Sequence, residues 1–505
     1  MRKIYVLFLL AGLLSSPIIA QEKSDLDVIA QIREEGFQRS QVMDIVSYMT
    51  DVHGNRLVGS LGMKKAQIWA KAKMEEIGLE NTIIEPILDH GVSWDNEYTS
   101  IHMLEPGYYP IVGFPLAYTP GTNGKITGEV LIAEINSRQD LAKYKGQLRN
   151  KIVLISPLLM IDPTVPIIRN RRTEENLNDL RDPVFPTPAQ SSPRVANPNQ
   201  VSSVARLDFL TSEGAALVIE SRGGRLGVVR TFARPGANQS GWSREGMVNS
   251  IPMITVLPEQ YNRMYRIIKR GIPVSLEVEI RNNIGNATQV NNVLGEIPGT
   301  DPDLRDEIVM LGSHFDSWHT SPGATDNASG CSVMFEAMRI LKAIDAKPRR
   351  TIRFALWSSE EDGLRGSSNY VKKYFGDPQT GIKPAYNKFS VYYNQDYDKG
   401  QYRGIYLQGN EFVRQIFTKW TSLFNDLGMT TVSIRSVGST DHIPFDRAGL
   451  PAFQFLQDRI GQGTGHTNLD FYDNLVQEDL MKNAVIMASF VYLSAMMDEK
   501  MPRKK

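Results

Sequence analysis

Four short apolar segments between residues 307 and 457 lead into side chains that commonly bind metal ions. The polar side chains that follow them are His314, the pair Glu360 and Glu361, Asp396, and His466. From residue 292 onward such strand patterns alternate with helix patterns, which is typical of a mainly parallel sheet flanked by helices. Because open α/β sheets bind ligands at the carboxyl ends of their strands, we expect these side chains to lie close together.

Two polar loops add candidates to this group. Residues 323–330 form a glycine-bounded loop before an apolar helix, and Asp326 within it can reach metals held beside His314. The ordinary interpretation of that loop is a helix N-cap, where Asp, Asn and Ser are common. Residues 438–445 form a second polar loop that contains His442, and a capped turn explains this loop equally well.

Taken singly, each of these motifs has a simpler explanation. A lone His at a strand end is usually a surface residue, and a Glu-Glu pair usually begins a solvated helix, where acidic side chains favour the helix dipole. Four such motifs on consecutive strands of one sheet are hard to explain by coincidence. The pattern therefore predicts a metal site.

Composition limits both the ligands and the partners. The chain has one cysteine, Cys331, so a metal site must use His and carboxylate ligands, which suit hard or borderline ions. Lys and Arg together number 56, as do Asp and Glu. This balance gives no net field that would favour nucleic acid or an anionic membrane.

The N-terminus has the pattern of a secretory signal peptide. Arg2 and Lys3 precede an apolar run over residues 4–14, and Ala20 offers a small residue before Gln21. The alternative is a retained membrane anchor, but the run is short for a bilayer span. We expect residues 1–20 to be cleaved and the protein to be exported, periplasmic or secreted, with no stable membrane insertion afterwards.

A chain of 505 residues is too long for one ordinary core, so more than one domain is expected. Residues 21–120 are expected to form the N-terminal part of the domain that carries the metal site, with helical patterns over residues 42–49 and 66–77 and a plausible helix stop at Gly78. Residues 121–285 show short strands and one helix, which predicts a separate small α/β insert with a long loop over residues 157–200. The metal-binding part follows over residues 286–500. Residues 502–505 are expected to fray.

The motifs together resemble the di-zinc aminopeptidase superfamily of metallopeptidases, which includes bacterial aminopeptidases, glutamate carboxypeptidase and glutaminyl cyclases. The similarity runs in order across about residues 290–480, and the overall plan looks most like the carboxypeptidase Q-like members, whose insert resembles a protease-associated domain. The motifs that carry it are His314-x-Asp316, Gly-Ala-x-Asp326-Asn-x-Ser-Gly, Trp-x-x-Glu360-Glu361-x-Gly, Asp396, Ser-x-Asp441-His442-x-Pro-Phe and His466-Thr-x-x-Asp470.

This resemblance implies a mixed, mainly parallel sheet flanked by helices and a site for two Zn²⁺ ions. Asp326 would bridge the two ions, and the peptide bond between Asp326 and Asn327 would be cis. Asp316 would orient His314, and Glu360 would be the general base. The remaining ligands would be His314 and Asp396 on one ion, and Glu361 and His466 on the other.

The implied activity is that of an exported zinc-dependent exopeptidase, an aminopeptidase or a dipeptidase, acting on peptides. Relatives are often homodimers. Some carry a Tyr before the last His ligand as oxyanion donor, but Gly465 stands there in this chain. We therefore consider His442 a candidate donor. A one-zinc glutaminyl cyclase and a non-catalytic relative are the alternatives, and the second is disfavoured because every ligand position is filled. The remaining histidines are expected to be structural: His53, His90, His102 and His319.

Overall fold

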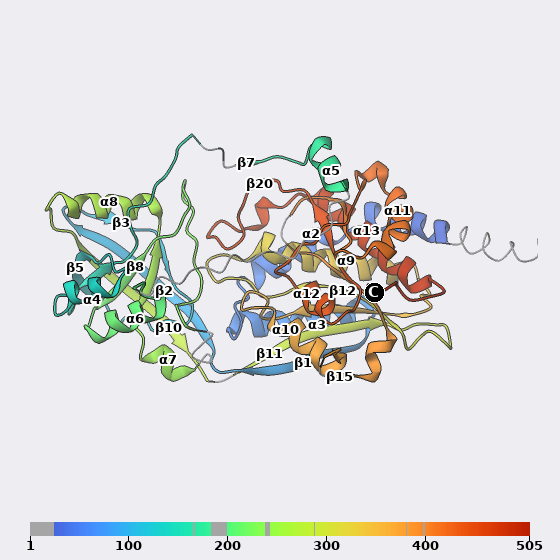
Figure 1. The fold of residues 1–505 in the computed structure, drawn as a ribbon, viewed down its shortest axis with the longest axis horizontal. Coiled ribbons are helices and arrows are strands. Elements are labelled where there is room, and N and C mark those ends of the chain that lie inside the picture. The colour runs from blue at the N-terminus through green and yellow to red at the C-terminus, as the bar shows by residue number, and fades with distance from the viewer. Residues whose placement is uncertain are drawn as a thin grey trace, which may run out of the picture.

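The computed structural model describes residues 25–164, 166, 168–182, 199–237, 243–286, 288–379, 381–396 and 399–504. Two eight-stranded sheets lie side by side, each with its own helices (Figure 1). We call them the main sheet, on the right of that view, and the second sheet, on the left. The predicted signal peptide in residues 1–20 lies outside the described residues.

The main sheet is mixed and mainly parallel, which confirms the predicted fold class. Strands β13, β12, β16 and β19 run parallel at its centre, and antiparallel pairs lie toward the edges. In spatial order its strands are β1 (Glu80–His90), β11 (Thr288–Ile297), β13 (Thr351–Trp357), β12 (Ile308–His314), β16 (Phe389–Asn394), β19 (Ala452–Gln457), β17 (Tyr402–Tyr406) and β18 (Thr431–Ser433).

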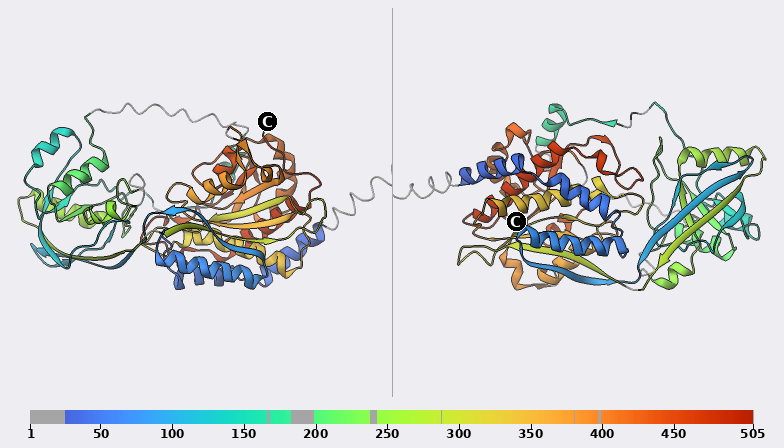
Figure 2. Two further views of the ribbon diagram at one scale, coloured as in Figure 1. Left: turned by 90° about the horizontal axis from the view of Figure 1, so that it is seen from below. Right: turned by 180° about the vertical axis from the view of Figure 1, so that it is seen from behind.

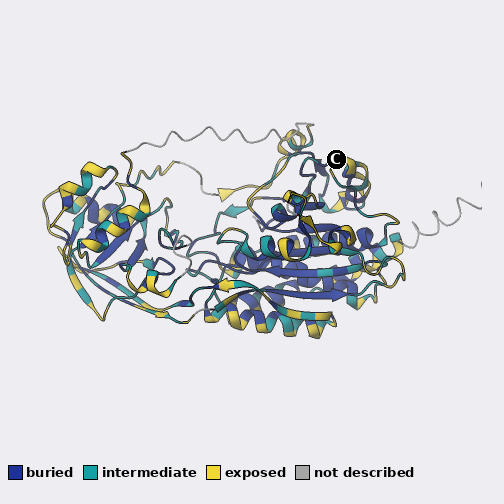
Figure 3. Ribbon diagram, turned by 60° about the horizontal axis from the view of Figure 1, so that its bottom comes forward, coloured by how far each residue is buried: buried dark blue, intermediate teal, exposed yellow. Residues whose placement is uncertain are grey.

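Helices cover both faces of the main sheet because its central strands are apolar on both sides. On β12, Val309 and Leu311 pack into one core and Met310 into the other. Figure 2 shows the strands between the helical layers, and Figure 3 shows that they are largely buried. The helices on the Val309 side are α2 (Val42–Ser47), α3 (Leu61–Ile77), α9 (Ser329–Ala343), α11 (Arg414–Ser422) and α13 (Gln477–Met496), and those on the other side are α10 (Arg365–Tyr374) and α12 (His442–Arg447).

The second sheet is smaller and also carries helices on both faces. Helix α8 (Pro258–Lys269) packs into one of its cores, and α4 (Arg138–Tyr144) and α6 (Ser203–Ser212) into the other. In spatial order its strands are β3 (Tyr109–Pro110), β2 (Trp94–Glu105), β10 (Ser275–Ile284), β5 (Ile126–Ile132), β6 (Ile152–Leu154), β8 (Leu217–Glu220), β9 (Met253–Val256) and β4 (Gly113–Pro115). The similarity of this region to a protease-associated domain stays a prediction.

The chain passes from the main sheet to the second sheet and back through two antiparallel pairs of strands. His90 at the end of β1 lies opposite Thr288 at the start of β11. Trp94 at the start of β2 lies opposite Ile284 at the end of β10. The second sheet therefore begins before residue 121, where the sequence analysis placed the start of the insert. A small apolar cluster that includes Trp318 joins the two regions.

Two local expectations were wrong. The predicted loop over residues 157–200 contains helix α5 (Glu174–Arg181), which begins at the capping residue Thr173 and has acidic residues in its first turn. Residues 502–504 are held in place, because Arg503 donates a hydrogen bond to the Tyr386 carbonyl oxygen (2.6 Å) and Lys504 pairs with Asp446, while Lys505 lies outside the described residues. No helix within the described part of the chain combines the length and apolar character needed to cross a bilayer.

Candidate metal centre

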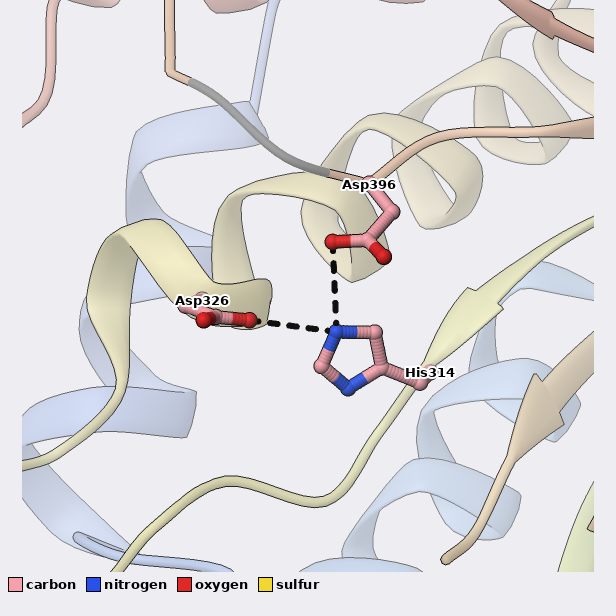
Figure 4. Close-up of side chains that lie close together, drawn as sticks. All are labelled: His314, Asp326 and Asp396. Atoms are coloured by element: carbon pink, nitrogen blue, oxygen red, sulfur yellow. Dashed lines mark ion pairs between the residues drawn. The ribbon is translucent and has the colours of Figure 1, made fainter. Parts of the chain in front are cut away.

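Three side chains from separate elements meet at the carboxyl end of the main sheet (Figure 4). His314 is the last residue of β12, Asp396 lies two residues beyond β16, and Asp326 belongs to the π-helical turn η2 (Ala324–Ala328). His314 Nε2 lies 3.2 Å from Asp326 Oδ1 and 3.4 Å from Asp396 Oδ1. The Asp326–Asn327 peptide bond is cis. One nitrogen and two carboxylates thus converge on one point.

A second group of three shares Asp326 with the first. His466 Nε2 lies 3.0 Å from Asp326 Oδ2 and 2.9 Å from Glu361 Oε2. Glu361 follows β13 by four residues, and His466 follows β19 by nine, so the strand order brings both to the same edge. The two oxygens of Asp326 face the two groups separately. This arrangement fits a carboxylate that bridges two cations.

The carboxylates make this site attract positive charge. Burial lowers the pKa of His466, but the carboxylates of Asp326 and Glu361 outweigh burial and raise that pKa to about 11. Burial likewise opposes the charged form of His314, yet the carboxylates of Asp396 and Glu360 raise its pKa above the usual range. Because the imidazolium form is favoured by these neighbours, a cation in its place would be favoured as well.

The residues of the site fit zinc. Glu361 Oε1 is buried and has no hydrogen-bond partner within the described parts of the chain, which is costly unless a cation occupies the space beside it. Imidazole nitrogen and carboxylate oxygen are ligands that catalytic zinc uses. The five side chains that the sequence analysis named as ligands therefore supply two sets of three donors, with Asp326 in both.

Asp316 contacts His314, as expected, and does so through its backbone. His314 Nδ1 lies 3.0 Å from the backbone carbonyl oxygen of Asp316, and the Asp316 carboxylate is farther from that nitrogen, at 3.8 Å. The carboxylate instead accepts hydrogen bonds from the backbone N–H groups of Glu360 and Glu361, both at 3.2 Å. Asp316 thus orients the histidine with its backbone and fixes the glutamate pair with its side chain.

Glu360 belongs to neither group of three and lines a cavity of about 580 Å³ beside them. No hydrogen bond or ion pair of its carboxylate is found among the described residues. Burial raises the pKa of Glu360 well above its ordinary value, and the negative charge of Asp396 adds to this. Ser359, directly before it, has a φ of 62°, which is rare for residues other than glycine. The backbone is thus bent where the two glutamates must point to different places.

His442 lies near the site, but it does not line the cavity beside Glu360. It is fully buried, and its Nε2 lies 2.7 Å from Gln408 Nε2 and 3.0 Å from the Val437 carbonyl oxygen. Burial lowers its pKa to about 4, so the imidazole is neutral at pH 7. The cation on the wall of that cavity is Arg447, which the sequence analysis did not single out.

Three further residues hold the site together. Asp470 accepts hydrogen bonds from Thr325 and from the Asp326 N–H, and Trp318 Nε1 donates one to Glu361 Oε2 (2.9 Å). The fully buried Arg56 donates hydrogen bonds to the carbonyl oxygens of Phe315 and Pro322, both at 2.7 Å. Asp470 ends the motif His466-Thr-x-x-Asp470, but the sequence alone indicated no role for it. No local signal marked Arg56, because its partners are backbone atoms far along the chain.

The remaining histidines make other contacts. His319 Nε2 lies 2.7 Å from the Pro115 carbonyl oxygen, and the rings of His53 and His102 contact Trp69 and Tyr108. Within the described residues, none of the four remaining histidines joins a group of possible metal ligands. The sequence has a second aspartate near the end of β16, Asp398, and the family spacing favours Asp396 as the ligand; Asp398 lies outside the described residues. The one cysteine, Cys331, is buried, and its Sγ donates to the His314 carbonyl oxygen.

The chain is similar to known peptidases in sequence and in fold. Residues 292–491 match the model of peptidase family M28. Human carboxypeptidase Q is 25% identical over 488 residues, which cover 96% of this chain and 90% of that protein. The crystal structure of a peptidase M28 precursor from Shewanella amazonensis is similar in fold, with a TM-score of 0.67, 22% identity, and coverage of 96% of this chain and 99% of that one.

A zinc aminopeptidase from Bacillus subtilis is also similar in fold, with a TM-score of 0.58, 18% identity, and coverage of 90% of this chain and 95% of that one. The family match covers the part of the chain that carries all five candidate ligands, and the similarity to carboxypeptidase Q extends over both sheets. The comparisons therefore support a place in the di-zinc aminopeptidase superfamily, close to carboxypeptidase Q, and the chain is a metallo-exopeptidase.

Proposed function

We propose that this protein is an exported exopeptidase that hydrolyses peptide bonds at a centre of two Zn²⁺ ions. His314, Asp396 and Asp326 would hold one ion, and Glu361, His466 and Asp326 the other. The observation that supports this proposal most is the position of Asp326, whose two oxygens face His314 Nε2 and His466 Nε2 at 3.2 and 3.0 Å. A shared carboxylate favours a two-metal peptidase over a one-zinc cyclase.

When bound, zinc supplies a Lewis acid that polarises the scissile carbonyl and makes water more acidic. Glu360 would take a proton from the attacking water and pass it to the leaving amine nitrogen. Its raised pKa suits the first of these steps, because burial makes this carboxylate a stronger proton acceptor than an exposed glutamate. Asp316 would keep Glu360 and Glu361 in place through their backbone N–H groups.

The donor that stabilises the developing oxyanion would be a residue other than the one directly before His466. A Cβ atom at Gly465 would lie 2.9 Å from Asp326 Oδ2, so a larger residue there would press on the proposed bridging ligand. Arg447 lines the cavity beside Glu360 and carries a permanent positive charge. We propose Arg447 for this role in preference to His442, which is turned toward Gln408 and Val437. The proposal also includes export through a signal peptide and a homodimer like those of related enzymes.

Replacing the proposed base tests the mechanism. In Glu360→Gln, turnover of short peptides should fall by roughly 10²- to 10⁴-fold, the usual contribution of a general base, or more. Zinc content per chain, measured by plasma mass spectrometry, should stay at the wild-type value because the ligands are intact.

Asp326→Ala is the matching variant for the metal. It should lose zinc as well as activity, because both groups of donors contain Asp326. The exposed Glu411→Gln serves as the control and should change neither quantity. Wild-type turnover in Glu360→Gln would refute the role of the base, and an unchanged zinc count in Asp326→Ala would refute the bridge.

A further inference from the structure

A second cavity, of about 190 Å³, adjoins the metal centre and is lined by positive charge. It shares Asp326 and His466 with the site, and the loop over residues 460–465 forms much of its wall. Its cationic side chains are Arg169, Arg230 and Lys399. Two of these, Arg169 and Arg230, come from the chain between β2 and β10, so the region of the second sheet contributes directly to the wall.

Arg230 is held against the loop that carries His466. Its Nη1 donates a hydrogen bond to the Gly465 carbonyl oxygen (3.2 Å), and its backbone forms a bridge with Thr467. The neighbouring Val229 N–H donates to Asn468 Oδ1 (2.7 Å), and the Asn468 N–H donates back to the Val229 carbonyl oxygen (3.1 Å). These contacts fix the guanidinium one residue away from a proposed zinc ligand.

Arg169 reaches the same loop from a different segment. Strand β7 (Ile168–Arg169) pairs antiparallel with β20 (Gly461–Gln462). A Cβ atom at Gly463 would lie 3.2 Å from Arg169 Nη2, so the guanidinium covers the space that this glycine leaves open. The strand pairing and the small residue together place Arg169 over the cavity wall.

The two guanidinium groups affect each other. Burial lowers the pKa of Arg230, and the positive charge of Arg169 lowers it further. Within the described parts of the chain, neither side chain forms an ion pair with a carboxylate. Two like charges that line one cavity and form no ion pair repel each other, and an anion bound between them would relieve the repulsion. Guanidinium groups bind carboxylates in a planar, two-pronged geometry.

We propose that Arg169 and Arg230 form a subsite that binds a carboxylate of the substrate and so determine specificity. This inference rests on the proposed peptidase function. A peptide at the metal centre would extend from the cavity beside Glu360 toward the second cavity, since both cavities share Asp326 and His466. The carboxylate could be the free C-terminus of a short peptide or an acidic side chain, and the chemistry of recognition is the same.

Three substrates separate these sources: the free acid Ala-Leu, its C-terminal amide, and the amide of Ala-Glu. The wild-type enzyme should show a kcat/KM for at least one carboxylate-bearing peptide that is roughly 10- to 100-fold above that for Ala-Leu amide, as expected for a charge-assisted hydrogen bond. A preference for Ala-Leu identifies the C-terminus, and a preference for Ala-Glu amide identifies a side chain. Equal kcat/KM values for all three would overturn the subsite.

Arg230→Met and Arg169→Met should each move the ratio of these kcat/KM values toward one, whereas Arg230→Lys should keep part of the preference. Arg270→Met, an exposed arginine at the end of α8, is the control and should leave the ratio at the wild-type value. An unchanged ratio in both methionine variants would contradict the assignment.

Calorimetry on Glu360→Gln makes the test independent of turnover. Ala-Leu should bind this inactive variant roughly 10- to 100-fold more tightly than Ala-Leu amide if the C-terminus is recognised, and Ala-Glu amide should do so if a side chain is. The preference should disappear when Arg230→Met is added. If the wild-type enzyme hydrolyses none of the peptides, the proposed function fails, while a binding preference would still support the subsite and equal affinities would overturn it.

Discussion

Asp470 shows how one carboxylate can fix a metal ligand without touching the metal. Its Oδ1 accepts hydrogen bonds from the N–H (2.7 Å) and the hydroxyl (2.6 Å) of Thr325, and its Oδ2 accepts from the Asp326 N–H (3.1 Å). Burial raises the pKa of Asp470 to about 6, but the hydrogen bonds from Thr325 oppose that shift. The turn that presents Asp326 is therefore tied down on the side away from the proposed ions.

Asp470→Asn should weaken zinc binding by roughly 10- to 100-fold, the usual effect of removing a partner that orients a ligand. The amide offers one acceptor oxygen in place of two, so one N–H of the turn loses its partner. Competition with a chelating dye measures the zinc Kd, and excess zinc should restore part of the activity. The nearby exposed Asp473→Asn is the control. Equal zinc Kd values in Asp470→Asn and the wild type would show that the turn holds its shape without this carboxylate.

At the scale of residues, the sequence predicts the side chains that stand at strand ends. His314, Glu361 and Asp396 follow directly from the rule that parallel strands present their carboxyl ends at one edge. The contacts of the Asp316 carboxylate with the backbone of Glu360 and Glu361, and the role of Arg56, could not be predicted in this way. Both side chains act mainly on backbone atoms, and the pairing of a side chain with a distant backbone group depends on the tertiary fold, which leaves no periodic signal in the sequence.

At the scale of elements, a buried group of charges joins the N-terminal helix over residues 25–38 to α9. Arg339 donates hydrogen bonds to Glu35 (2.6 Å) and to Glu336 (2.8 and 2.9 Å), and all three side chains are at most 10% exposed. Burial alone would raise the pKa of Glu35, but the hydrogen bonds from Arg339 and Arg39 lower it below the ordinary 4.5.

Arg339→Met should lower the free energy of unfolding by about 3–5 kcal/mol, because it leaves buried carboxylates unpaired. Urea denaturation measures this change, and Lys347→Met, in an exposed pair with Asp345, should have an effect of less than about 1 kcal/mol.

The folded state lowers the pKa of Glu35, so this carboxylate stabilises the fold above pH 4.5 and loses that effect as the pH falls. The difference between the wild type and Arg339→Met should therefore shrink in acid. A constant difference between pH 7 and pH 3 would contradict the role of this ion group.

Elements whose apolar residues recur at a regular spacing were predicted well, and elements in which apolar and polar residues alternate irregularly were not predicted. Helix α3 ends at Gly78, which has a φ of 89°, as its spacing of apolar residues indicated. Strands β1 and β2 were not predicted. Both leave one edge or face in solvent over much of their length, and their exposed polar residues interrupt the alternation that marks a half-buried strand.

At the scale of the whole molecule, the five proposed ligands come from one strand end, from loops after three other strands and from one turn, so bound metal would link these elements. Removal of zinc with a chelator should lower the Tm, and added zinc should restore it. At a free zinc concentration of 1,000 times the Kd, the stabilisation should be about 4 kcal/mol. Differential scanning calorimetry measures the shift. Glu360→Gln should show the same shift and Asp326→Ala should show none.

The sequence predicted the mixed, mainly parallel fold class, because strand and helix patterns alternate from residue 292 onward. It could not predict how the second sheet sits against the main one. That arrangement depends on scattered contacts such as the packing of Phe232 against His466 and Trp318, whose ring centroids lie 5.4 Å from that of Phe232 in both cases. Contacts of single side chains between distant segments carry no pattern that one sequence reveals.

The way in which the chain passes between the two sheets has a consequence for how such a protein can evolve. His90 and Thr288 are opposite each other in one antiparallel ladder, so their Cα atoms are about 5 Å apart. A hairpin turn of about two residues could span that distance in place of everything from residue 91 to residue 287. A single excision or insertion in the gene is therefore enough to lose or acquire the whole second unit, and the strands on either side of the splice need not change their pairing.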